Sequence, residues 1–424
     1  MHDQQKRGQR IAVIGAGVVG MATAYHLAER GHHVTVIERA KAPAEGCSFA
    51  NAGIIAVGHA ESWAGPAAPA QMIHALLGRT PSVKISKLMD PQLWRWGLAF
   101  LRQCSARANR ENSGAMAWLA RHGRQELQAL EQATGLAFEQ GHDGAYYLYG
   151  EESAFAARKA SDHLEGFSPM SAEELTQWDP ALKVYGDRLK GGLLSSVDSK
   201  GDCRRFTRAL AQWLEQNRQV TFHYGATVTG FERAQGRVSA VQTTDGPVRC
   251  DQVVIAAGVG TVALGKQLGV RPLIYPVKGY SATYPIRDGA YMPARPLVDE
   301  TNLIAVTRLG SYLRVTAIAE FAGHDSSPNP ERAAYLDDYV ARHFGCAVEL
   351  DAVTHWAGLR PTTPSGRPYL GRLRTHRNVW FNAGHGQLGW TMAAGAGQLL
   401  AERLHGAQSP SYGVSETARW LIAA

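Results

Sequence analysis

Three glycines near the start of the chain have the spacing of a phosphate-binding loop. Gly15, Gly17 and Gly20 form the pattern G-x-G-x-x-G between an apolar run and a stretch with helical periodicity. The first glycine permits a tight turn, the second lets the backbone approach a pyrophosphate, and the third lets helix and strand pack closely. Glu38 ends the next apolar run, where a carboxylate accepts hydrogen bonds from ribose hydroxyls and disfavours a 2′-phosphate. These residues predict dinucleotide binding and leave NAD and FAD open.

A second glycine-rich turn lies close to the end of the chain, in FNAGHGQLGWTMAAGAG. Gly384, Gly386 and Gly389 would let an apolar strand turn into a helix with its backbone against a flat ligand and with the first helical N–H groups exposed. Gly395 and Gly397 fall inside the predicted helix, where they predict close packing against another helix.

Arg360 lies among apolar residues in the segment WAGLRPTTP. A guanidinium in such a setting needs a partner, because an unpaired buried charge is costly. Two interpretations follow from the residues alone. Arg360 either pairs with an acid or carbonyl groups of the protein, or presents its planar fork to the carboxylate of a ligand.

Other polar residues are candidates for the same site. Tyr280, in VKGYSATYPI, is either a packing residue of a strand or a polar group at a pocket. Tyr284 lies four residues later and therefore on the same side of that strand. His59 and His385 follow predicted cofactor loops, where we expect hydrogen-bonding groups and not acid–base catalysts.

Hydrophobic periodicity predicts the elements that position these residues. Residues 11–37 predict a strand, a glycine turn, a helix and a second strand. Residues 66–134 then become helical, an excursion that a regular series of alternating strands and helices does not contain. Late strands in VTFHYGATVTGFER and CDQVVIAAG return to flank a dinucleotide, which favours FAD over NAD. Residues 272–315 alternate as in an antiparallel sheet.

The expected fold class is α/β, with a Rossmann-like FAD-binding domain and an interleaved α+β substrate domain that contains an antiparallel sheet. A chain of 424 residues is long enough for both domains. The predicted FAD-binding domain is discontinuous and takes residues 1–65, 190–270 and 355–424. The predicted substrate-binding domain takes residues 66–189 and 271–354.

Composition argues against several function classes. The net charge is +7, but the basic residues are scattered and form no stripe with interleaved aromatics, so we expect no nucleic-acid partner. The five cysteines contain no C-x-x-C pair, which argues against a disulfide scaffold and for a reducing compartment. We predict no metal site, since no cluster has metal-ligand spacing. The expected location is cytoplasmic.

The chain resembles a known family. The N-terminal strand–helix–strand unit, SFANAG, PVKGYS, WAGLRPTTPSGRPYLG and NAGHGQLGWTMAAGAGQLLAE occur in the order and approximate spacing of FAD-dependent amine oxidoreductases of the D-amino-acid oxidase superfamily. Within it the chain looks most like the bacterial D-amino-acid dehydrogenases of the small-subunit type. The similarity runs over essentially the whole chain.

The resemblance implies FAD as cofactor and an amino acid as substrate. It implies oxidative deamination of D-amino acids to 2-oxo acids and ammonia, by hydride transfer from Cα to flavin N5, with electrons passed to quinone or another acceptor. Arg360 would bind the substrate carboxylate, and Tyr280 would contact substrate. The start of the last helix would stabilise negative charge on the reduced flavin. Three alternatives stay open: a D-proline or hydroxyproline type of imino-acid dehydrogenase, a glycine or sarcosine oxidase, and a non-catalytic FAD-binding module.

The expected site therefore has two parts. Its catalytic part contains Arg360, Tyr280, Tyr284 and His59. Its cofactor part is formed by Gly15, Gly17, Val18, Gly20, Glu38, Arg39, Ser48, Asn51, Ala52, Gly53, Val228, Ala256, Ala257, Gly258, Gly384, His385, Gly386, Leu388, Gly389, Trp390 and Thr391.

One segment bears on the electron acceptor. LWRWGLAFLRQC, residues 93–104, combines tryptophans and aliphatic residues with two arginines at helical spacing. This mixture suits a peripheral contact with the inner face of a membrane and delivery of electrons to quinone. It equally suits ordinary packing of the helix in the protein core.

Overall fold

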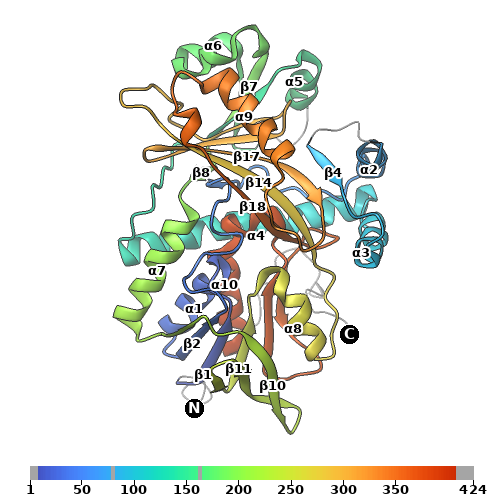
Figure 1. Cartoon of the computed structure of the whole chain (residues 1–424), viewed down its shortest axis with the longest axis vertical. Helices are drawn as coiled ribbons and strands as arrows, with labels where there is room; N and C mark the ends of the chain where they lie inside the picture. The colour runs from blue at the N-terminus through green and yellow to red at the C-terminus, as the bar shows by residue number, and fades with distance from the viewer. Residues whose placement is uncertain (1–7, 78–81, 161–164, 407–424) are drawn as a thin grey trace.

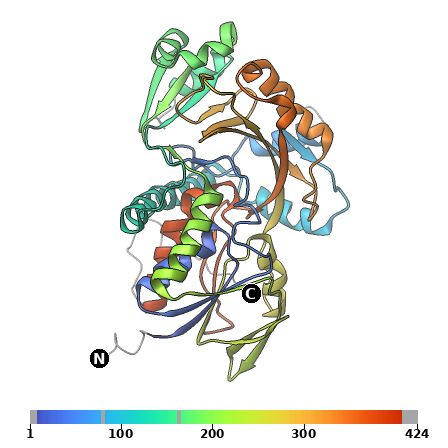
Figure 2. The same cartoon turned by 60° about the vertical axis from the view of Figure 1, so that its left-hand side comes forward.

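The computed structural model describes residues 8–77, 82–160 and 165–406. Two large β-sheets lie one above the other in Figure 1, and helix α4 (Ala106–Thr134) crosses between them. Figure 2, turned by 60°, shows the same two bodies. The chain passes from one body to the other several times, so each contains segments that are far apart in the sequence.

The lower body is built on a six-stranded sheet with the order β19-β20-β13-β1-β2-β9, parallel except for the β19–β20 pair. Its register aligns Ile37, Ile14, Ile255 and Phe381 in one row. The segments that follow these strands therefore leave the sheet at one edge, where open parallel sheets bind ligands. The strands are β1 (Arg10–Ile14), β2 (His33–Glu38), β9 (Thr221–Tyr224), β13 (Gln252–Ile255), β19 (Tyr369–Arg372) and β20 (Val379–Ala383).

Helices pack on one face of this sheet and a small antiparallel sheet on the other. A Cβ at Gly397 would lie 2.9 Å from the backbone of Ala22, and one at Gly395 would lie 2.8 Å from the backbone of Gly123. The predicted close packing by these glycines is confirmed. The helical face has α1 (Val18–Glu29), α7 (Cys203–Arg218), α10 (Gly389–His405) and α4, and the other face has β10 (Val228–Ala234), β11 (Arg237–Thr243), β12 (Gly246–Arg249), η3 (Gly258–Gly260) and α8 (Thr261–Gln267).

The upper body is built on a nine-stranded sheet with the order β18-β14-β17-β16-β15-β5-β7-β6, to which β4 adds by pairing with β17. One face packs against α9 (Pro330–Phe344), and the other faces the lower body. The strands are β4 (Val83–Ile85), β5 (Ala145–Tyr149), β6 (Phe167–Ser171), β7 (Gly191–Ser195), β14 (Tyr275–Pro285), β15 (Leu297–Asp299), β16 (Ile304–Leu309), β17 (Tyr312–Phe321) and β18 (Thr354–Thr362).

Short elements complete the described chain. Helices α2 and α3 pack beside β14, and none of the helices in the described ranges is long and apolar enough to cross a membrane. The remaining elements are α2 (Ala68–Leu76), α3 (Pro91–Leu101), α5 (Glu152–Lys159), α6 (Ala172–Trp178), η2 (Pro180–Arg188), η4 (Leu350–Ala352), η5 (Gly386–Leu388) and the pair β3 (Ile54–Ile55) and β8 (Ser199–Lys200).

Most predicted elements are confirmed, including the strand–helix–strand start and the antiparallel strands β14, β16 and β17. Two strands need a correction. β7 and β18 lie in the nine-stranded sheet, although the predicted ranges 190–270 and 355–424 assigned them to the FAD-binding domain. Neither segment was predicted as a strand: β7 pairs with β5 and β6 of the preceding segment, and β18 pairs with the distant β14. The other domain boundaries stay a prediction.

Candidate active site

The first glycine loop leaves no room for side chains. Gly15 has φ +110°, and a Cβ there would lie 2.6 Å from the carbonyl oxygen of Ala256. A Cβ at Gly20 would lie 1.9 Å from the carbonyl oxygen of Gly15. Gly17 stands before the first residue of α1 and supplies no side-chain cap. Strand β1 therefore turns into a helix whose N-cap residue has no side chain to cap it, which is the arrangement that binds phosphate through backbone N–H groups.

Glu38 lies at the end of β2 beside this loop. Its Oε2 accepts a hydrogen bond from the Ala16 N–H and its Oε1 accepts one from the Ala40 N–H, both at 2.8 Å. These bonds hold the carboxylate at the sheet edge, and its remaining lone pairs suit ribose hydroxyls. Arg39, the next residue, is exposed.

The segment 48–53 closes over the same edge. Ser48 Oγ accepts from the Val18 N–H at 3.0 Å, and Asn51 Oδ1 accepts from the Gly53 N–H at 3.1 Å. Gly53 has φ +70° and its carbonyl accepts from the Gly201 N–H. The segment is thus held by its own backbone and by α1, with Ala52 partly exposed beside it.

Late strands flank the loop as predicted. β13 pairs with β1 and ends before Ala256 and Ala257, and Gly258 follows with φ +55° and open space where a Cβ would stand. Val228 begins β10 and is partly exposed.

The last glycine turn joins β20 to α10. Gly384 and Gly386 have φ +86° and +54°, and a Cβ at Gly384 would lie 2.6 Å from Thr363 Cγ2. His385 is buried, its Nε2 has no partner among the described residues, and burial lowers the pKa of His385 to about 3. Leu388 precedes Gly389, the first residue of α10, and gives no side-chain cap. The start of α10 thus has no side-chain cap at its N-cap residue, and one nitrogen of a buried imidazole has no partner among the described residues.

Two residues next to this turn face inward. The Trp390 indole donates to the Gly201 carbonyl at 3.2 Å and packs against Phe138 and Phe206. Thr391 Oγ1 accepts from the Ala56 N–H at 3.0 Å. Both side chains are therefore engaged within the protein, and the cofactor contact that the sequence predicted for these two residues stays a prediction.

Together these features fit a long dinucleotide with a planar ring. Two helix starts lack side-chain caps, glycines stand where a Cβ would collide, and an imidazole nitrogen is buried without a partner. Gly15, Gly17 and Glu38 would hold the phosphate and ribose groups, and residues 384–389 would hold the ring.

Arg360 lies on β18, on the face of the upper sheet that carries Val277 and Gly279 of β14. Its Nη1 donates to the Ile318 carbonyl at 2.9 Å. Ile318 has φ +66° at a register shift of β17, an unusual conformation for a β-branched residue, and the bulge it belongs to directs this carbonyl to Arg360. Burial lowers the pKa of Arg360, and the nearby Cys47 opposes that effect.

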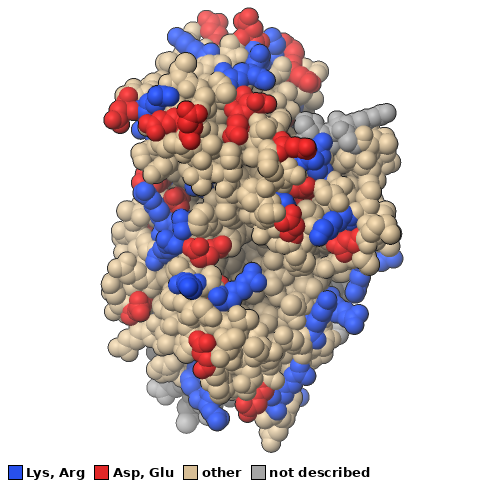
Figure 3. Space-filling model, viewed as in Figure 1, with Lys and Arg blue, Asp and Glu red and all other residues tan. Residues whose placement is uncertain are grey.

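No carboxylate within the described ranges forms an ion pair with Arg360. The strand that carries it also reaches the last glycine turn, because Thr362 forms an antiparallel bridge with His385. Arg360 is two residues from that bridge, about 7 Å along an extended strand. A largely buried cation without an acidic partner therefore lies beside the segment that would hold the ring. Figure 3 shows a recess near the middle of the molecule, where the two bodies meet.

Tyr280 and Tyr284 do not join Arg360. Both face α9 on the opposite side of the sheet, where the Tyr280 hydroxyl donates to Glu320 and the Tyr284 hydroxyl to Asp337. Burial, and then these acidic partners, raise the pKa of both phenols. Because Val277 is the direct partner of Arg360, the even-numbered residues of β14 point away from it. This corrects the predicted substrate contact.

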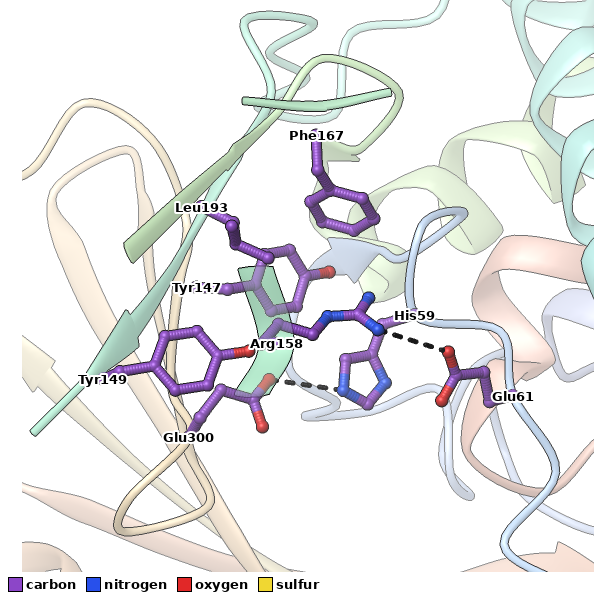
Figure 4. Close-up of a pocket in the computed structure, with 8 residues that line it drawn as sticks. All are labelled: His59, Glu61, Tyr147, Tyr149, Arg158, Phe167, Leu193 and Glu300. Carbon is purple, nitrogen blue, oxygen red and sulfur yellow. Dashed lines mark ion pairs between the residues drawn. The ribbon is translucent and has the colours of Figure 1, made fainter. Parts of the chain in front are cut away.

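His59 lies in a different cavity, of about 160 Å³, drawn in Figure 4. Its ring stacks on Tyr147 of β5, with centroids 5.5 Å apart, and its Nε2 lies 3.2 Å from Glu300 Oε1. Burial lowers the pKa of His59, but the bond to Glu300 and the charges of Glu300 and Glu61 raise it overall to about 9. β5 and β18 are separated by β15, β16, β17 and β14. At about 4.8 Å per strand, the cavity lies roughly 20–25 Å from Arg360.

Sequence reasoning missed the residues that hold Arg360 in place, Gly279 and Ile318. A glycine inside a strand pattern often marks a close approach of another group, so Gly279 carried a usable signal. Ile318 carried none, since an isoleucine in a strand predicts ordinary packing. In the part of the chain that the structure describes, no group of three or more His, Cys, Asp or Glu is arranged to hold a metal ion.

Comparisons with known proteins find relatives over most of the chain. The D-amino acid dehydrogenase of Cereibacter sphaeroides is 41% identical over 402 residues, which cover 94% of this chain and 92% of that protein. The D-amino acid dehydrogenase of Xanthobacter autotrophicus is 38% identical over 409 residues, which cover 94% and 95%. The glycine oxidase of Geobacillus kaustophilus shares the fold, with a TM-score of 0.71 at 20% identity over 97% of this chain and 99% of that one.

A family model described as DAO, FAD dependent oxidoreductase, matches residues 10–403. The chain therefore belongs to the DAO family of FAD-dependent oxidoreductases, and FAD is its cofactor.

Proposed function

We propose that this protein oxidises D-amino acids to 2-oxo acids and ammonia, with FAD as the first electron acceptor. The observation that carries the proposal is Arg360, a largely buried guanidinium without a carboxylate partner in the described chain, beside the turn that would hold the flavin ring. The names of the relatives supply the substrate class, since those proteins are called D-amino acid dehydrogenases.

In this proposal Arg360 binds the substrate carboxylate. The bond from Nη1 to the Ile318 carbonyl fixes the plane of the guanidinium, and the rest of the fork stays available for the two oxygens of a carboxylate. The low exposure of Arg360 strengthens the attraction, because fewer water molecules screen it. A carboxylate held in this way fixes the orientation of Cα, and orientation supplies much of the rate in such reactions.

Bound FAD would accept a hydride. The chain contributes the uncapped start of α10, whose positive end favours negative charge on a reduced ring. We assign no protein base, since Tyr280 and Tyr284 lie on the face of the sheet opposite Arg360 and His59 lies in a separate cavity several strands away. The substrate amine must then lose its proton before oxidation, and the rate is expected to rise with pH through that ionisation.

The test is anaerobic reduction of the holoenzyme flavin, followed by its absorbance. The panel contains D- and L-amino acids, glycine, sarcosine and D-proline, with Arg360→Ala and the matched control Arg308→Ala, an exposed arginine on β16 of the same sheet. We expect D-amino acids to reduce the wild-type and Arg308→Ala flavins, and Arg360→Ala to require much higher substrate concentrations. The proposal fails if Arg360→Ala saturates at the same concentration as wild type.

The same panel separates the alternatives. Faster reduction by D-proline or its hydroxylated form would identify an imino-acid dehydrogenase. Reduction by glycine or sarcosine with prompt peroxide formation in air would identify an oxidase. A flavin that no amine reduces would identify a non-catalytic FAD-binding module.

We propose further that α2 and α3 make a peripheral membrane contact that serves electron transfer to quinone. Trp96 and Phe100 of α3 pack inward against Tyr275, and the Trp96 indole donates to the Thr362 carbonyl at 2.9 Å, two residues from Arg360. The opposite side of both helices is apolar and exposed, and little charge gathers around α2 in Figure 3. An exposed apolar patch of this kind suits a membrane interface. We define the α2–α3 patch as Ile73, Leu76, Leu77, Leu88, Met89, Trp94, Leu98 and Leu101.

A further inference from the structure

Two glycines directly opposite each other leave a stretch of the sheet surface beside Arg360 without side chains. Gly279 of β14 pairs with Gly358 of β18. A Cβ at Gly279 would lie 2.3 Å from Arg360 Cζ, and a Cβ at Gly358 would lie 1.9 Å from Trp356 Cη2. Cβ positions of directly opposed residues are only about 5 Å apart. The guanidinium of Arg360 lies over Gly279 and the outer edge of the Trp356 indole lies over Gly358, so the two groups are neighbours.

A second aromatic ring extends this surface. The Phe49 ring lies against Trp356, with centroids 6.0 Å apart and planes inclined by 24°. Cys47 Sγ donates to the Leu359 carbonyl at 2.8 Å, which ties the segment with Phe49 to β18. Phe49, Trp356 and Arg360 all keep part of their surface exposed. The aromatic surface is therefore not closed inside the core, and both rings and the guanidinium keep area that a ligand can contact.

The charges at the edge of this surface are mostly positive. Arg204 Cζ lies 3.7 Å from the centroid of the Phe49 ring. Arg204 and Arg208 share one acid, with Nη2 atoms 3.3 and 2.6 Å from Glu45 Oε1. Two cations against one carboxylate disfavour an additional cation there.

We propose that Trp356, backed by Phe49, receives the side chain of the amino acid whose carboxylate Arg360 holds. This inference rests on the proposed function. The enzyme then prefers amino acids with aromatic or large apolar side chains, because a ring or branched chain buries apolar surface against the indole. Alanine offers little such surface, and lysine or arginine side chains would meet the positive edge.

The test compares substrates within each holoenzyme variant. Trp356→Ala is expected to lower the ratio of kcat/KM for D-phenylalanine to kcat/KM for D-alanine by about tenfold or more, the range in which apolar contacts discriminate. Trp356→Phe, which keeps a flat ring, is expected to restore most of the ratio. Trp178→Ala removes an exposed tryptophan of α6 and should leave the ratio of the two kcat/KM values unchanged.

Ligand binding supplies a second measurement that needs no turnover. The Kd values of benzoate and acetate are measured by titration calorimetry on each holoenzyme. Trp356→Ala should weaken benzoate more than acetate. An unchanged benzoate-to-acetate ratio, or a D-phenylalanine ratio that stays equal or rises, overturns the inference.

The outcomes also distinguish a failure of this inference from a failure of the proposed function on which it rests. If wild type oxidises D-amino acids and depends on Arg360, but substitution of Trp356 leaves both ratios unchanged, only the inference fails. If no amino acid reduces the wild-type flavin, the proposed function fails and the inference fails with it.

Discussion

The guanidinium of Arg360 lies on Gly279, in the space that a side chain at that position would fill. A Cβ there would approach Arg360 Cζ, Nη2 and Nη1 to 2.3, 2.4 and 2.5 Å. The glycine is thus part of the geometry that holds the arginine, together with the Ile318 carbonyl on the neighbouring strand. A carboxylate site at Arg360 depends on a residue that itself contributes no functional group.

Gly279→Ala is therefore expected to displace the guanidinium and to lower kcat/KM by up to about 100-fold, the cost of a misplacement near 1 Å. The loss should appear mainly in KM, since the carboxylate contact is the one disturbed. Steady-state kinetics with an artificial acceptor measure it, and flavin absorbance checks the FAD content. Gly114→Ala, on α4 with nothing within 4 Å of the added Cβ, is the control. A Gly279→Ala enzyme with wild-type KM would contradict this account of Arg360.

His59→Gln is expected to leave kcat/KM within about threefold of wild type, because its cavity lies several strands from Arg360 and distant sites act independently. A second variant, Glu300→Gln, tests the ion pair between His59 and Glu300. The pKa of His59 is raised to about 9, so this pair stabilises the fold below the unfolded value of about 6.5 and ceases to do so as pH rises through 9. Glu300→Gln should lower the pKa of His59, read by NMR titration of its ring protons. A large loss of activity in His59→Gln would restore His59 to the catalytic site.

The cofactor part of the site could be predicted from the sequence because its signals are local. Gly15, Gly17 and Gly20 stand within one turn, and Glu38 follows after a single helix and strand. The same holds for Gly384, Gly386 and Gly389. In each case the glycine positions follow from the conformation of one short segment, which sequence spacing describes well.

The substrate part depends on a pairing that spacing does not describe. Arg360 faces Gly279 and not Tyr280 because β14 and β18 pair in one particular register, across about eighty residues of intervening chain, and a shift of one residue would exchange the two faces. The segment Lys278–Gly279–Tyr280 therefore pointed to the correct strand, β14, but the residue next to Arg360 is Gly279 and not Tyr280. β7 has a different cause, since it was not predicted as a strand and it pairs with β5 and β6, which lie just before the predicted boundary at residue 190.

Replacing Trp94 and Leu98 together by glutamate is expected to weaken vesicle binding by at least about tenfold, because two exposed apolar side chains of the α2–α3 patch are lost and two negative charges are added. Sedimentation with vesicles of phosphatidylethanolamine and phosphatidylglycerol measures binding. Turnover with a water-soluble dye should stay near wild type, while turnover with a quinone in vesicles falls. Trp178→Glu, an equally exposed tryptophan on α6, is the control. Undiminished vesicle binding by the double variant would exclude this surface.

Gly123→Ala is expected to destabilise the protein, because its Cβ would lie 2.1 Å from the carbonyl oxygen of Thr391 where α4 crosses α10. The backbone cannot move aside as a flexible side chain can, so the helices must separate. This lowers the free energy of unfolding by about 1–3 kcal/mol or more. Gly114→Ala on the same helix meets nothing within 4 Å and should be neutral or stabilising by about 0.5–1 kcal/mol. Thermal unfolding of both holoenzymes makes the comparison. Equal melting temperatures would mean that the α4–α10 contact is looser than the structure has it.

Acidification is expected to destabilise the protein through a histidine buried in α1. Burial first, and then the charges of Arg30 and His122, lower the pKa of His26 to about 3, against 6.5 when unfolded. The folded state therefore excludes a proton that the unfolded state binds, so stability is complete above 6.5 and declines as pH falls towards 3. Denaturant unfolding between about pH 7 and about pH 5 should show a smaller loss of unfolding free energy for His26→Leu than for wild type. His74→Leu, at an exposed position on α2, should keep the wild-type slope. If His26→Leu also keeps that slope, His26 accepts its proton without unfolding and the acid sensitivity arises elsewhere.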